Sequence, residues 1–495
     1  MLMLNKKGHK NSGASYASGI AVFIATIAAL YYLYSASYLG AAVQWIGALV
    51  ALVLSGTAIR AIFSLHGGYG LYMLSGSGGI ATVRRIARGH AKFWHSLALW
   101  GIVLGFGVLA YPLLRGRISK RLYAVGLVSL LIIMFFVLPF LSYSVLFINI
   151  APLQRYVPAA QQLPSLSTFV AEALSGGAAE YALHAATFVA GFSGYMFYLL
   201  ALNSYNILLS VVRAVSTSSL APISSQVPGV APLIPGVDTP LFAGIAALII
   251  ILVVHEMSHG VLASLFNVKL KSVGVLVFGL IPVGAFVEPD EKQVARLPDI
   301  QQNEILSAGV SSNFLLMLVF LVPMIIMIPY VVQHIYQQSV IITGTIPGYP
   351  AYNVIQPGSQ VISWNGYRVS NLAGFEGFAS NETPGSVINI VTSTGSYALT
   401  SMRSNDSTHS LIGIEVGAVT RAVTPTLLYK SVYFFYTLFA LLFMLHFLVA
   451  VVNLLPIPGL DGWRIYSTSV RSRRVVRTLT GLVLFFLLVN VLPWI

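Results

Sequence analysis

Nine long apolar runs dominate this 495-residue sequence and restrict what it can fold into. Each run reaches the length of about 20 residues that a helix needs to cross the hydrocarbon core of a bilayer. Only 8% of the residues are charged and 57% are hydrophobic, whereas charged residues make up about 25% of an average soluble protein. The sequence therefore predicts an all-α polytopic membrane protein with about 8–9 transmembrane helices. The runs lie near residues 17–38, 40–64, 95–114, 122–152, 179–213, 240–266, 304–333, 426–455 and 475–495.

Basic residues outnumber acidic ones, and the formal net charge is +13. Because the Lys and Arg residues stand in short clusters between apolar runs, we interpret them as topology signals that face an anionic lipid leaflet, not as a nucleic-acid surface. The first apolar run follows Lys6, Lys7 and Lys10, as in a signal peptide. It is too long for a cleaved segment, so we expect it to be retained as a helix.

One long stretch, residues 340–420, is too polar to span a membrane. It contains patches of alternating apolar and polar residues at 360–367 and 386–392, and the turn signal Asn365-Gly366 lies in the first patch. This pattern predicts a small β-rich domain outside the bilayer.

Clusters of basic residues follow the runs at 240–266 and 426–455, and the positive-inside rule places both loops in the cytoplasm. Residues 214–239, which lack Lys and Arg, and the polar stretch then lie outside. One loop disagrees, because its basic residues would face outside if every earlier run crossed once. The two clusters are Lys269, Lys271, Lys292 and Arg296, then Arg464, Arg471, Arg473, Arg474 and Arg477; the disagreeing loop holds Arg115, Arg117, Lys120 and Arg121.

Glu256 is the only formally charged residue in the run at 240–266, and it follows His255 and precedes His259. A carboxylate inside a spanning helix is costly unless it is paired or hydrated, so it indicates function. Two histidines four residues apart share one helix face and can bind one zinc ion, while the glutamate beside them can take a proton from water. The alternative is a pair of buried histidines hydrogen-bonded around a structural glutamate.

A hydrolytic zinc site needs a third protein ligand, and the sequence contains no cysteine to supply it. The candidate is Asp461, in the segment 453–462 that reads NLLPIPGLDG. Pro456 and Pro458 must interrupt the helix there. Both this segment and the histidines lie at the cytoplasmic ends of spans that run the same way, so they can meet at one depth. The alternative is an ordinary helix exit followed by a turn.

These two motifs, in this order and with a soluble insert between them, resemble the site-2 protease family of intramembrane zinc metalloproteases. The resemblance covers residues 179–495. It implies one zinc ion per chain, bound by His255, His259 and Asp461, with Glu256 as the general base. It also implies membrane-anchored protein substrates that are cut in or near the bilayer.

The segment from Gly309 to Asn313 resembles the Gly-x-x-x-Asn motif of the same family, although Val310 stands where the family often has proline. By this resemblance Asn313 helps to hold the scissile carbonyl; alternatively, it forms a hydrogen bond between helices. His446 has no partner at ligand spacing, and we interpret it as an interfacial or interhelical residue.

Three further segments are similar to parts of this family. Residues 232–236 resemble the loop before the catalytic span in archaeal-type members. Residues 272–287 resemble a membrane-dipping β-hairpin, with a plain cytoplasmic hairpin as the alternative. Residues 350–366 of the insert resemble a PDZ domain, a fold that binds an extended peptide at a sheet edge. A spacer that filters large substrates is the alternative for the insert.

The predicted function is an intramembrane zinc endopeptidase in a cell membrane, with the zinc site towards the cytoplasm and the insert outside. We expect accessory helices at 1–178, a protease core at 179–335 and 425–495, and a PDZ-like insert at 340–420. A metal transporter and a catalytically inactive scaffold of protease descent are the alternatives. Transport would favour polar residues on several other spans, which are nearly free of them. No nucleic-acid partner is expected, and the sequence leaves the oligomeric state open.

Overall fold

A computed structural model describes most of the chain, and nine helices among the described residues are long and apolar enough to cross a membrane. Each overlaps one of the nine predicted runs, so the chain is a multi-pass membrane protein with a smaller β-rich part. The part of the fourth run beyond residue 141 and most of the loop at 232–236 lie outside the described residues. The structure describes residues 13–494 apart from 37–40, 142–176, 227, 230–234, 236–238, 335, 371, 404–409 and 423–426.

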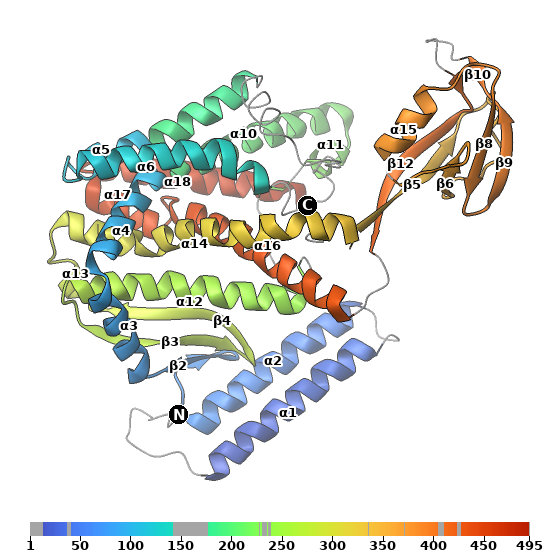
Figure 1. Cartoon of the computed structure of the whole chain (residues 1–495). Helices are drawn as coiled ribbons and strands as arrows, with labels where there is room; N and C mark the ends of the chain where they lie inside the picture. Colours follow the sequence, from blue (N-terminus) through green and yellow to red (C-terminus); the bar gives the residue numbers. More distant parts are fainter. Residues whose placement is uncertain are drawn as a thin grey trace. The chain divides into compact units, whose positions relative to one another are not determined.

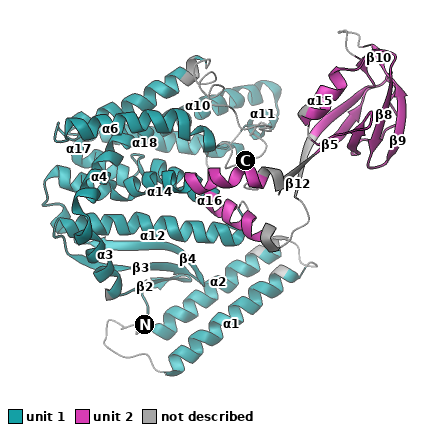
Figure 2. Ribbon diagram, viewed as in Figure 1, with its two compact units in different colours: residues 1–152, 165–320, 440–495 teal, residues 153–164, 321–439 magenta. Residues whose placement is uncertain are grey.

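The chain forms two compact units (Figure 2). Unit 1 takes the described residues of 1–152, 165–320 and 440–495, and unit 2 takes those of 321–439. Helices α14 and α16 each contribute residues to both units. The helices of the bundle are α1 (Gly13–Ser35), α2 (Ala41–Phe63), α3 (Ser77–Gly89), α4 (Ala91–Phe106), η1 (Gly107–Leu109), α5 (Ala110–Leu113), α6 (Lys120–Ile132), η2 (Ile133–Val137), α10 (Ala178–Thr217), α11 (Ala221–Ser224), α12 (Leu241–Leu265), α13 (Glu291–Val294), α14 (Asp299–His334), α16 (Leu427–Asn453), α17 (Asp461–Ser469), α18 (Arg473–Val491) and η3 (Leu492–Trp494).

A four-stranded antiparallel sheet packs against α12 in unit 1 (Figure 1). Strands β3 and β4 form a hairpin where the sequence predicts one, at residues 272–287. Gly279 opens its two-residue loop with φ of +61°, as a type II′ turn requires. Strand β2 pairs with β3 and was not among the predicted elements. The strand order is β1 (Gly67–Gly68), β2 (Leu71–Ser75), β3 (Leu270–Phe278) and β4 (Ile281–Pro289).

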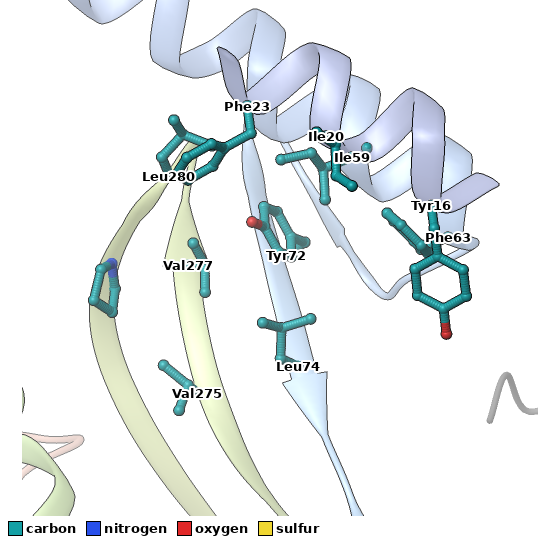
Figure 3. Close-up of a pocket in the computed structure, with 12 residues that line it drawn as sticks. Tyr16, Ile20, Phe23, Ile59, Phe63, Tyr72, Leu74, Val275, Val277 and Leu280 are labelled. Carbon is teal, nitrogen blue, oxygen red and sulfur yellow. The ribbon is translucent and has the colours of Figure 1, made fainter. Parts of the chain in front are cut away.

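Helices α1 and α2 pack as an antiparallel pair beside this sheet, and a cavity of about 520 Å³ lies between them and the strands (Figure 3). Its described lining is apolar apart from the hydroxyls of Tyr16 and Tyr72. The Tyr72 hydroxyl donates a hydrogen bond to the Gly279 carbonyl at 3.0 Å, and burial raises its pKa, so this phenol stays neutral. The described lining residues include no carboxylate and no imidazole.

The run at 95–114 does not carry the chain from one end of the helix bundle to the other. His95 Nδ1 lies 2.6 Å from Glu304 Oε2, and Arg115 pairs with Asp299 at 2.6 Å. Both ends of the run therefore contact the first turns of α14, and Figure 1 shows α4 steeply inclined to α12 and α14. The basic loop after this run lies at the same end of the bundle as the N-terminus of α14.

Glycines allow the helices around α4 to approach closely. Helix α10 departs from helical geometry at Gly191, where φ is +63°. A Cβ atom at this position would lie 2.3 Å from the backbone carbon of Gly105 on α4. Any other residue would therefore be strained and would also clash. In the same way, a Cβ atom at Gly101 would collide with Ser311 of α14, so α4 and α14 are fixed against each other.

Unit 2 contains a six-stranded sheet built on a long two-stranded ribbon. Strands β5 (Tyr336–Thr345) and β12 (Ile414–Ala422) pair along their whole length. The sheet continues through β6 (Gln360–Trp364), β8 (Val387–Thr392) and β9 (Gly395–Thr400), in the order β12-β5-β6-β8-β9. The remaining elements are β7 (Tyr367–Arg368), which pairs with β6, the pair β10 (Met402–Arg403) and β11 (Ser410–Leu411), and α15 (Leu372–Ser380).

Local sequence signals explain this sheet. Asn365 and Gly366 both have positive φ, 49° and 83°, which is the geometry of a type I′ hairpin turn. Side chains along β8 alternate between exposed and more buried, with Ile388 and Ile390 in a core that also holds Trp364. The predicted β-rich domain is present, whereas its likeness to a PDZ domain stays a prediction.

The bundle geometry makes a testable prediction about topology. The natural chain has no cysteine, so single-cysteine variants report one position each. We expect Arg117→Cys and Lys292→Cys, both exposed, to react from the same side of sealed vesicles with a membrane-impermeant maleimide. Ser219→Cys, in the loop without basic residues, should react from the other side. Labelling of Arg117→Cys together with Ser219→Cys would show that the run at 95–114 crosses after all.

Candidate metal and catalytic site

Helix α12 presents His255 and His259 on one face, one turn apart, as the sequence predicts. Their Nε2 atoms lie 3.3 Å from each other. Both side chains are largely buried, with exposed fractions of 8% and 12%. The helix is placed by tight packing on the sheet, because a Cβ atom at Gly260 would lie 2.7 Å from Val287 of β4. Two imidazoles thus converge inside the bundle.

Asp461 is the first residue of α17, and its Oδ2 atom lies 3.2 Å from Nε2 of His255 and 3.2 Å from Nε2 of His259. The chain reaches this point through the expected interruption after α16, since Asn453 ends that helix. Gly462 allows the turn to close: a Cβ atom there would lie 2.3 Å from the Leu454 backbone. The Asp-Gly pair therefore brings the carboxylate against the histidines.

The three atoms fit a divalent metal ion. Ligand atoms about 2.0–2.1 Å from a tetrahedral zinc ion lie roughly 3.3 Å apart, and the three observed distances are 3.2, 3.2 and 3.3 Å. Within the described residues, Asp461 Oδ2 is buried and accepts no hydrogen bond. A Cβ atom at Gly309 would lie 2.5–2.6 Å from both Nε2 atoms, so the glycine leaves open the space beside the ligand atoms. The site is a possible His-His-Asp metal site.

Helix α14 orients both imidazoles through contacts with their Nδ1 atoms, which lie on the side of each ring away from the ligand atoms. His259 Nδ1–H donates to the Ile305 carbonyl at 2.6 Å, so in the neutral imidazole Nε2 is the unprotonated nitrogen and can bind a metal. His255 Nδ1 lies 3.1 Å from the side-chain amide of Asn313. Asn313 is fully buried and contacts helices other than its own, so it forms the interhelical contact that was one of its two interpretations.

Glu256 follows His255 on α12 and is half-buried. In the described part of the chain it has no recorded hydrogen bond or ion pair, and its carboxylate does not belong to the cluster of three ligand atoms. This placement is compatible with the predicted role of general base.

Helix α17 is anchored behind Asp461 by Tyr466. The Tyr466 hydroxyl lies 2.8 Å from Ser193 Oγ on α10, and its ring packs edge-on against Phe106. Burial raises the pKa of this phenol, so it stays neutral and serves as a hydrogen-bonding group. At the surface, Arg464 pairs with Glu291 at 2.5 Å. These contacts fix the position of α17 and therefore of Asp461, the third candidate ligand, at its N-terminus.

The sequence analysis gave His446 no part in the site and interpreted it as an interfacial or interhelical residue, and its contact in the structure is interhelical. His446 of α16 is fully buried, and its Nδ1 atom lies 3.1 Å from Asn313 Oδ1. The signal that could have found it is general, because an ionisable residue inside a spanning helix indicates function by default. Its partner could not be identified, since Asn313 lies on another helix far away in the sequence.

The fold and this site define a polytopic membrane protein with a candidate three-ligand metal centre of the metallopeptidase kind. Comparison with known families agrees: the model of Peptidase family M50 matches residues 243–491. This match includes both motifs and covers half of the chain. The chain belongs to Peptidase family M50, the site-2 protease family that its motifs resemble, and the family's general activity is intramembrane metalloproteolysis.

A relative is found in Methanocaldococcus jannaschii. Over 231 residues the chain is 28% identical to an uncharacterized protein of that organism, and the match covers 46% of this chain and 57% of that protein. The chain thus matches somewhat more than half the length of this relative.

The position of Gly309 generates a prediction about metal binding. We expect Gly309→Ala to push His255 and His259 apart, because the new methyl group would lie 2.5–2.6 Å from their Nε2 atoms. Overpacking of this kind costs about 1–3 kcal/mol, which corresponds to a loss of roughly 5- to 150-fold in zinc affinity. Competition with a chromophoric chelator would measure it. Gly481→Ala, where a Cβ atom meets nothing within 4 Å, is the control, and equal affinities for both variants would contradict the assignment.

Proposed function

We propose that this protein is a zinc-dependent endopeptidase that hydrolyses peptide bonds in or near transmembrane segments of membrane-anchored proteins. The observation that supports it is the convergence of His255, His259 and Asp461 at ligand spacing inside a bundle of apolar helices. His255, His259 and Asp461 would hold one zinc ion per chain. Family membership supports the peptidase activity and disfavours a metal transporter.

Glu256 is the proposed general base. When bound, zinc lowers the pKa of a water molecule towards about 7 and polarises the peptide carbonyl. Glu256 takes the proton from the attacking water and later delivers it to the leaving amine. The buried Asp461 and the two imidazoles keep their ligand atoms together, and the surrounding apolar helices limit the access of bulk water. Asn313 remains a proposed aid to catalysis, either at the scissile carbonyl or through His255.

A membrane-anchored substrate presents its peptide carbonyls in the hydrogen bonds of its own helix. It must therefore unwind locally before Glu256 and the water can reach a carbonyl. We expect cleavage near Gly, Pro or Asn residues of the substrate segment, because these residues weaken a helix. The protein's partners would then be such substrates and the lipid bilayer.

The topology that we propose places the metal site towards the cytoplasm of a cell membrane. Arg115 and its basic neighbours lie at the end of the bundle that also holds the N-terminus of α14, because Arg115 pairs with Asp299. Arg464, in the other basic segment, pairs with Glu291 just before α14. The basic loops thus gather at one end, which the positive-inside rule assigns to the cytoplasm. The β-rich insert would lie outside.

The proposed division of labour predicts different results for two substitutions. Glu256→Gln preserves shape but removes the base, so zinc should stay bound while cleavage of a model transmembrane substrate falls about 10²–10⁴-fold. Asp461→Ala should lose both zinc and activity, because two imidazoles alone hold zinc weakly. Metal analysis and a cleavage assay on the purified chain would check this.

Loss of zinc from Glu256→Gln would make Glu256 a ligand or a support. A wild-type chain that binds zinc but cleaves no membrane substrate would favour the alternative of an inactive scaffold.

The insert should govern access or recognition and supply no catalytic group. The structure shows where to cut: Thr345 and Ile414 are paired neighbours at the end of the β5–β12 ribbon, so a short turn can replace residues 346–413. We expect this variant to keep its zinc and to cleave a small, already trimmed substrate, while its selection among larger substrates changes. Looser selection indicates a filter, and weaker capture indicates a peptide-binding PDZ-like domain. A variant that folds and binds zinc but cleaves nothing would contradict the proposal.

A further inference from the structure

His446 is a buried imidazole with one polar contact among the described residues. Its ring is fully buried and stacks on Phe320, with ring centroids 5.7 Å apart. Its Nδ1 atom contacts Asn313 Oδ1 at 3.1 Å, and within the described part of the chain its Nε2 atom has no hydrogen-bond partner. Burying an imidazole with a single hydrogen bond is costly compared with an apolar side chain of similar size. This cost indicates that the contact with Asn313 serves a purpose.

Asn313 connects His446 to the metal site. In the structure its Nδ2 atom lies 3.1 Å from Nδ1 of His255 on one side, and its Oδ1 atom lies 3.1 Å from Nδ1 of His446 on the other. The three side chains come from α12, α14 and α16 and form one buried chain of hydrogen-bonding groups. A change in the hydrogen bonding of His446 therefore affects His255 through the Asn313 amide, and the reverse also holds.

The chemistry of a neutral imidazole decides the direction of these hydrogen bonds. His255 can bind a metal through Nε2 only if its proton sits on Nδ1, and that Nδ1–H needs an acceptor. The acceptor must be the oxygen of the Asn313 amide. Half a turn of the amide, which exchanges oxygen and nitrogen without changing its shape, places this oxygen towards His255. The amide N–H then points at His446 Nδ1, which must accept it.

We propose that His446 is a positioning residue that acts through Asn313: by accepting the amide N–H, it turns the amide oxygen towards His255 and holds His255 in the tautomer whose Nε2 binds the metal. This inference rests on the proposed zinc site. It assigns to His446 no contact with substrate or metal. For His259 the acceptor of the Nδ1–H is the backbone carbonyl of Ile305. A backbone carbonyl cannot exchange its oxygen for an N–H by rotation, so it needs no positioning residue.

The test uses side chains that place an amide at different points. Asparagine at position 446 can put a polar atom where Nδ1 of the imidazole lies. Glutamine puts its polar atoms where Nε2 lies, and leucine has no polar side-chain atom. We expect Asn313→Leu to weaken zinc binding about 10–100-fold, as loss of such outer partners does, and His446→Leu and His446→Gln to weaken it roughly tenfold. His446→Asn should restore affinity to within about threefold of wild type.

Zinc affinity of the full chain in detergent would be measured by chelator competition, and the absorption spectrum of the cobalt(II)-loaded protein would report the ligand geometry. Ser311→Ala is the matched control, because Ser311 is fully buried on the same helix and, among the described residues, its hydroxyl bonds to the backbone carbonyls of Ser307 and Ala98. It should leave both readouts unchanged. If His446→Leu fails to fold, the comparison of the asparagine and glutamine variants decides, since both keep an amide.

The outcomes separate this inference from the proposed function. Wild-type zinc affinity and cobalt spectrum in both His446→Leu and His446→Gln, or equal losses in the asparagine and glutamine variants, would overturn the role of His446. A wild-type chain that binds no zinc, or a His259→Ala variant that binds it as tightly as wild type, would instead overturn the metal site itself, because His259 does not contact Asn313.

Discussion

A buried carboxylate oxygen that accepts no hydrogen bond from any described residue is the constraint on which the rest of this bundle depends. In the described part of the chain, Asp461 Oδ2 lies among apolar helices with two imidazole nitrogens beside it. An ionised oxygen in such a place is unfavourable unless a positive charge compensates it, and the divalent metal ion that we propose for this site would supply that charge. The helices then have to hold three ligand atoms at fixed separations. Tight glycine contacts on α12 and α14 and the anchor behind α17 can be understood as the means by which they do so.

Much of this arrangement could be predicted from sequence because its signals are local. Apolar length locates the spans, the spacing of His255 and His259 puts both on one face, and two prolines stop the helix before Asp461. The Asn365-Gly366 turn and the hairpin at 272–287 are likewise set by residues next to each other. Family membership adds the activity class, although the ligand roles of the individual residues stay predictions that only measurement can test.

What could not be predicted depends on contacts between distant segments. An apolar run shows that a helix is long enough to cross, but not its inclination, so the path of α4 emerges only from the pairs His95–Glu304 and Arg115–Asp299. His446 gives no signal at ligand spacing because it touches the site through another side chain. Strand β2 is short, and its pairing partner lies on a hairpin far along the chain. The periodicity of apolar residues predicts the structure of a segment, but it does not predict which distant segments that segment contacts.

The sheet has a consequence for dividing this protein into fragments. The family match begins at residue 243, but the sheet that supports α12 begins at Gly67 and gains β2 from the N-terminal part of the chain. A fragment cut at the family boundary would leave β3 with a row of unpaired backbone groups from Gly274 to Phe278. Such an open edge pairs readily with other chains and promotes aggregation. The region that defines the family by sequence is therefore smaller than the piece that can fold by itself.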